Sequence, residues 1–165
     1  MKIFSRFWKR TFSLEIHLLL LYRLSRHVYL NWGAVGRFLA YALRHIMRVY
    51  TSCDISPLAQ IDKGVKFPHP LCIVIGDGVK IGKGTMIWQQ VTLGSHGRFG
   101  IEADYPVIGT NVRIYANASI LGAVSIGNDA VIGAHAVVTK NVPSGMVAYG
   151  IPAIVERKKG VNEDA

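Results

Sequence analysis

The sequence has few cysteines and no long apolar run. Only Cys53 and Cys72 occur among its 165 residues, and they lack disulfide spacing, so we expect a reducing compartment. The one run of strongly apolar residues, 18–22, is far shorter than the ~20 residues of a spanning helix. It is also not followed by the small-residue cleavage site of a signal peptide. These absences predict a cytoplasmic protein.

Acidic residues are almost missing from the first fifty positions. This stretch has nine Lys or Arg against one acid, Glu15, so its net charge is +8 of the chain's +9. Apolar residues at helical spacing predict two helices, over 13–30 and 34–50. A basic amphipathic segment can bind the inner face of the cytoplasmic membrane, where each charge contributes about 1 kcal/mol. Packing between subunits is the alternative. The segment has no recognition motif for nucleic acid, so we expect no such partner.

Aliphatic or aromatic residues recur every six positions in three runs. Within each run, a small or β-branched residue follows four positions later. Each hexad supplies a short strand and a turn, and three hexads close one coil, so the period predicts a β-helix stabilised by stacking. The repeating positions are Ile55, Ile61, Phe67, Ile75, Ile81, Ile87, Leu93, Ile108, Ile114, Ile120, Ile126, Ile132 and Val138.

Two breaks in this period predict loops that leave the coil, and such loops are often functional. Phe67 and Ile75 are eight residues apart, and Leu93 and Ile108 are fifteen apart. The first loop contains His69. The second contains His96, Arg98, Glu102, Asp104 and Tyr105. We therefore divide the chain into a basic helical segment (1–52), the β-helix (53–155) and a charged, poorly ordered tail (156–165).

Several motifs resemble the serine acetyltransferases and the short, related O-acetyltransferases of polysaccharide synthesis. They are Asp54-Ile55-Ser56-Pro57, the segment from His69-Pro70 to Gly76, and Val91-Thr92-Leu93-Gly94. We interpret the short, colanic acid type as the closer group. The resemblance implies a left-handed parallel β-helix, acetyl-CoA as co-substrate without a metal, and a homotrimer. Whether two trimers pair is left open.

The resemblance also implies catalytic residues. His69 would be the general base on the acceptor hydroxyl, and Asp54, fifteen residues earlier, would orient it. An imidazole with a pKa near neutrality can take the proton of a hydroxyl as it attacks a thioester. A carboxylate on the other ring nitrogen fixes the tautomer and stabilises the imidazolium.

Acetyl-CoA, by the same resemblance, would lie in a groove between neighbouring subunits. Its contacts would be Gly94, Ser95, Ala116, Ala134, Thr139 and Lys140. For the alanines, simple corner packing is an equally good interpretation. Lys140 would meet the nucleotide phosphates as a point charge, or would be a solvated turn residue.

The acceptor positions depart from those of the serine enzymes. Pro68 replaces an Asp before the base, and Asp104-Tyr105 replaces an Arg-His pair. Because Asp repels a carboxylate that Arg would bind, we predict a sugar or polysaccharide-precursor hydroxyl as acceptor, contacted by Tyr105, Asp104 and His96. Serine is the alternative. A non-catalytic scaffold and a metal-dependent hydratase are remote, since no closely spaced His pair suits a metal.

Overall fold

Two helices precede the repeats in the computed structural model, which describes residues 13–97 and 104–157. Helix α2 (Leu14–Asn31) and helix α3 (Gly33–Thr51) are separated only at Trp32. Gly33 has φ +56°, a left-handed conformation that costs glycine little. The two predicted helices are confirmed, with ends one residue from the expected ones.

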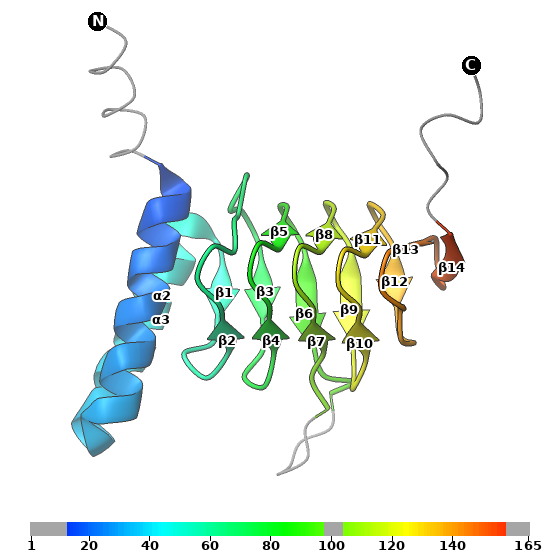
Figure 1. Ribbon diagram of the computed structural model, residues 1–165. Helices are drawn as coiled ribbons and strands as arrows, with labels where there is room; N and C mark the ends of the chain where they lie inside the picture. The colour runs from blue at the N-terminus through cyan, green and yellow to red at the C-terminus, as the bar shows by residue number, and fades with distance from the viewer. Residues whose placement is uncertain (1–12, 98–103, 158–165) are drawn as a thin grey trace, which may run out of the picture.

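The strands that follow the helices form three sheets, and the chain passes from one sheet to the next (Figure 1). Sheet A contains β1 (Asp54–Ile55), β3 (Val74–Ile75), β6 (Thr92–Gly94), β9 (Ser119–Leu121) and β12 (Val137–Val138). Sheet B contains β2 (Gln60–Ile61), β4 (Lys80–Ile81), β7 (Val107–Ile108) and β10 (Ser125–Ile126). Sheet C contains β5 (Met86–Ile87), β8 (Arg113–Ile114), β11 (Val131–Ile132), β13 (Met146–Tyr149) and β14 (Ile154–Arg157), and only β14 runs antiparallel to its neighbour.

The six-residue period fills the interior of this three-sided stack. Every repeating apolar position named above is buried except Ile61, which is partly exposed. The residues four places later are buried as well, from Ala59 in the first coil to Val142 in the last, except Leu71 and Gly97 in the two loops. The side chains therefore stack coil upon coil, as the sequence predicts.

The helix pair lies across the N-terminal end of the stack (Figure 1). The Tyr22 hydroxyl donates to the Ala59 carbonyl at 2.8 Å, and the Arg26 guanidinium donates to the carbonyls of Pro57 (3.0 Å) and Ala59 (2.8 Å). Arg44 and Arg48 bind Asp54. These three arginines thus bind residues of the coil, and membrane contact by the basic segment stays a prediction.

Neither helix in the described part of the chain is long and apolar enough to cross a membrane. At the other end of the chain, Glu156 and Arg157 belong to β14, so they are not part of the charged tail in which they were expected. Residues 158–165 of that tail lie outside the described residues.

Candidate active site

His69 sits on an exposed corner where the chain passes from sheet C to sheet A. Pro68 and Pro70 fix φ on both sides of it. The Cys53 thiol donates to the Pro70 carbonyl at 3.3 Å, and this bond ties the loop to the first coil. Beside His69 is a hollow of about 250 Å³, lined by Ser13, Leu14, Glu15, Pro68, His69, Pro70 and Leu71.

Asp54 lies in β1, next to Cys53, and so beside the loop of His69. Arg44 Nε and Arg48 Nη2 donate to its two carboxylate oxygens, the second at 2.7 Å. Burial alone would raise the pKa of this carboxyl, but the bonds and charges of Arg48 and Arg44 outweigh burial and lower it. Within the described residues no hydrogen bond joins Asp54 to His69. Catalytic hydrogen bonds often form only once substrate is bound.

The two arginines make Asp54 a pH-dependent stabiliser. We expect Asp54→Asn to lower the free energy of unfolding by on the order of 1 kcal/mol at neutral pH, since the ion pairs are partly exposed. The folded-state pKa lies below the unfolded one, so the contribution is complete above the unfolded pKa of about 4 and is lost as pH falls through the folded pKa. Urea unfolding of both proteins at pH 7 and at pH 3 measures this. An undiminished difference at the lowest pH that permits folding would exclude the carboxylate as its source.

Two of the predicted acetyl-CoA contacts share the edge of His69, where sheet C meets sheet A. Backbone hydrogen bonds connect its corners in sequence: Gln90 N to Leu71 O (2.9 Å), Asn117 N to Gln89 O (3.1 Å) and His135 N to Ala116 O (3.0 Å). With about 4.8 Å between coils, Ala116 and Ala134 lie roughly 10 and 14 Å along this edge from Leu71. The stacked rings of Trp88 and Tyr115 lie at the same edge, between the His69 loop and Ala134.

The other predicted contacts lie along a different edge, where sheet A meets sheet B. Gly94 ends β6 and Ser95 follows it, while Thr139 and Lys140 follow β12. The sides of the coil separate the two edges, so one chain does not bring all six residues to one site. A groove that uses them all needs the His69 edge of one subunit and the Gly94 edge of another.

The predicted acceptor residues also lie on the A–B edge. The ring of Tyr105 packs over the turn at Gly76 and Gly78, where an added Cβ would overlap it. The His96 ring lies in the same way against Gly122. Asp104 precedes Tyr105, and Arg98 and Glu102 lie outside the described residues. In a single chain these side chains are therefore remote from His69, and Tyr105 anchors its loop.

Sequence reasoning missed Glu15 beside His69 and the arginines on Asp54. Glu15 is the only acid of the first fifty residues, and Arg44 and Arg48 are four apart on one helix face just before Asp54. Both patterns were therefore visible in the sequence. What the sequence lacked was the placement of the helices against the first coil.

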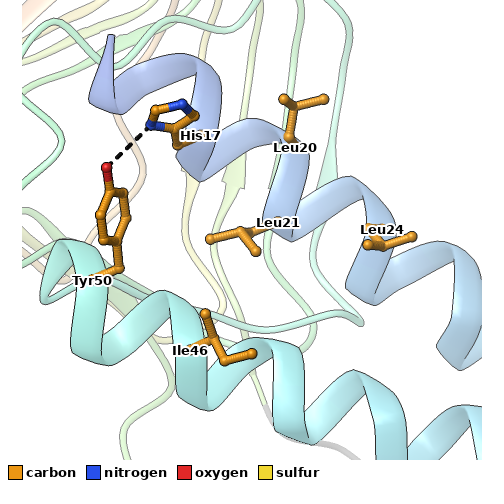
Figure 2. A pocket seen from close by; sticks show the side chains of 6 residues that line it. All are labelled: His17, Leu20, Leu21, Leu24, Ile46 and Tyr50. Carbon is orange, nitrogen blue, oxygen red and sulfur yellow. Dashed lines mark hydrogen bonds between the residues drawn. The ribbon is translucent and has the colours of Figure 1, made fainter. Parts of the chain in front are cut away.

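A larger hollow of about 570 Å³ lies between α2 and α3 (Figure 2). It is lined by His17, Leu20, Leu21, Leu24, Ile46 and Tyr50. Its walls are mostly apolar, and it contains none of the predicted site residues. No group of three or more His, Cys, Asp or Glu in residues 13–97 and 104–157 could hold a metal ion.

Known proteins resemble most of this chain. The family described as bacterial transferase hexapeptide (six repeats) matches residues 105–140. A serine acetyltransferase of Helicobacter pylori (strain ATCC 700392 / 26695) is 38% identical over 138 residues, which are 84% of this chain and 78% of that protein.

Two solved structures are also similar to this chain. A Neisseria gonorrhoeae serine acetyltransferase in complex with serine has a TM-score of 0.82 at 34% identity, covering 90% of this chain and 59% of its own. A serine acetyltransferase in complex with CoA has a TM-score of 0.79 at 33% identity, covering 88% and 58%. This chain thus spans less than two thirds of either solved chain.

Proposed function

Since this chain belongs to the serine acetyltransferase family, we propose that it transfers the acetyl group of acetyl-CoA to the hydroxyl of L-serine. Family membership makes it an acyltransferase with acetyl-CoA as co-substrate. The observation that carries the proposal is the position of His69. This exposed imidazole lines a small hollow and lies on the same edge of the coil as Ala116 and Ala134.

The reaction assigns a definite role to His69. A ring nitrogen takes the proton of the acceptor hydroxyl while the oxygen attacks the thioester carbonyl. The tetrahedral intermediate collapses as the carbon–sulfur bond breaks, and the imidazolium returns its proton to the CoA sulfur. The acetyl group is then an ester of the acceptor, and CoA leaves as the free thiol. Asp54 follows Cys53, which is bonded to the His69 loop at Pro70, and it would orient the ring once it exchanges an arginine for the imidazole.

A sugar hydroxyl is the second candidate acceptor. The relatives found favour serine, and they do not support the predicted closeness to the colanic acid type. One observation keeps the sugar in consideration: neither Lys nor Arg lines the hollow beside His69, so in the described part of one chain the carboxylate of serine has no cationic partner there.

Release of free CoA distinguishes the two acceptors. The full-length protein is incubated with acetyl-CoA and either L-serine or a panel of nucleotide sugars and glycan fragments. We expect release with L-serine. Release only with a sugar would favour the sugar hydroxyl as acceptor. No release with any acceptor would contradict acetyl transfer by this chain alone.

We also propose a left-handed coil and a homotrimer. The division of the predicted acetyl-CoA contacts between two edges supports the trimer, because neighbouring subunits would join the His69 edge to the Gly94 edge. Light scattering measures the mass in solution. A monomer that turns over at full rate would contradict a shared groove.

A further inference from the structure

The hollow beside His69 has one acidic side chain, Glu15, and its loop wall has few free hydrogen-bond donors. Its prolines, Pro68 and Pro70, have no N–H, and the Leu71 N–H is already bonded to the His69 carbonyl at 2.9 Å. Of the lining side chains only Ser13, Glu15 and His69 are polar. A donor group on a ligand, such as an ammonium or a hydroxyl, would therefore have an acceptor in the Glu15 carboxylate.

Glu15 is held where it can receive such a donor. Its Oε1 accepts a hydrogen bond from the Phe67 N–H at 2.8 Å. Because Phe67 is two residues before His69, this bond anchors the Glu15 carboxylate to the loop that contains His69. One oxygen is thereby fixed, and a carboxylate oxygen has further lone pairs for a ligand. The side chain is half-buried, so part of it still reaches solvent on the side of the hollow.

We propose that Glu15 is a specificity-determining residue that binds the donor group next to the reacting hydroxyl of the acceptor, which in L-serine is the ammonium. This inference rests on the proposed function, because it places the acceptor beside His69. In serine the ammonium and the hydroxyl are on adjacent carbons, so one small molecule can reach both Glu15 and His69. The serine carboxylate would then point out of the hollow, away from Glu15.

The test compares acceptors that have and lack the ammonium. Initial rates are measured with L-serine, L-serinamide and 3-hydroxypropanoate for the wild type and for Glu15→Gln. Gln can still accept from the Phe67 N–H but has no negative charge. We expect KM for L-serine and L-serinamide to rise about tenfold or more, because a charge-assisted bond to the ammonium is lost. KM for acetyl-CoA and the slow rate with 3-hydroxypropanoate should stay unchanged.

Glu156→Gln is the matched control, since it makes the same chemical change in β14 at the far end of the stack. An unchanged KM for L-serine in Glu15→Gln would overturn the role of Glu15 while acetyl transfer by the wild type still stood. An equal rise in the KM of all three acceptors, including 3-hydroxypropanoate, would exclude the ammonium as the group that Glu15 binds. An equal rise in both acceptor and acetyl-CoA KM, with a lower melting temperature, would make Glu15 structural.

Discussion

Replacing His69 by alanine is expected to reduce acetyl transfer by about a hundredfold to ten-thousandfold, the range that a general base contributes. The side chain is exposed, so its loss removes little packing. Binding of acetyl-CoA and the thermal unfolding of the coil should therefore stay close to those of the wild type. The measurement is CoA release under single-turnover conditions, with acetyl-CoA affinity determined separately by calorimetry.

His45→Ala is a suitable control for this variant, because His45 is exposed on α3 and lines neither hollow. Asp54→Asn should lose less activity than His69→Ala, since it disturbs the orientation of the base and leaves the base in place. Near-normal turnover by His69→Ala would assign the base to another residue. Loss of acetyl-CoA affinity as well would instead make His69 part of the binding site.

Ile120→Ala should cause the largest loss of stability. Ile120 lies in β9, between β6 and β12 in sheet A, and is 0% exposed. Truncation of such a side chain leaves a cavity that rigid neighbouring coils cannot fill, and it costs about 2–5 kcal/mol. Chemical denaturation followed by circular dichroism measures the change in the free energy of unfolding.

The same substitution at Ile154 is the control, because that side chain is 52% exposed on β14. We expect a loss well under 1 kcal/mol there. If both variants were equally stable, stacking of the inward aliphatic column would not be the main source of stability. If Ile120→Ala destabilised only one part of the unfolding transition, the coils would unfold in separate units.

The coil was predictable from sequence because its stabilising contacts repeat. Each inward position obeys the same steric rule, so a single period places Ile75 and Ile132 equally well, with no knowledge of distant contacts. The helices were predictable for a similar reason, since apolar spacing reflects the helical turn. Their position on the first coil was not, because it depends on single contacts such as the one between Tyr22 and Ala59.

The site was predictable only in part. The resemblance in motif and spacing pointed to His69 and Asp54, whose catalytic roles stay predictions, and the structure brings their neighbours Cys53 and Pro70 into contact. Spacing along the chain cannot tell which edge of a three-sided coil a residue occupies until the strands are assigned to sheets. Tyr105 and Ala116 therefore looked like parts of one site, although they belong to different edges of one subunit.

The two ends of the stack bear on how copies of this protein meet. A parallel coil ends in unsatisfied backbone groups that could template another coil, so an uncovered solenoid can grow into a fibre. Here Tyr22 and Arg26 occupy the outward carbonyls of Pro57 and Ala59 at one end. At the other end β14 reverses direction against β13, which interrupts the parallel register. Both features oppose end-to-end stacking of coils, and we expect copies of this protein to associate through lateral faces instead.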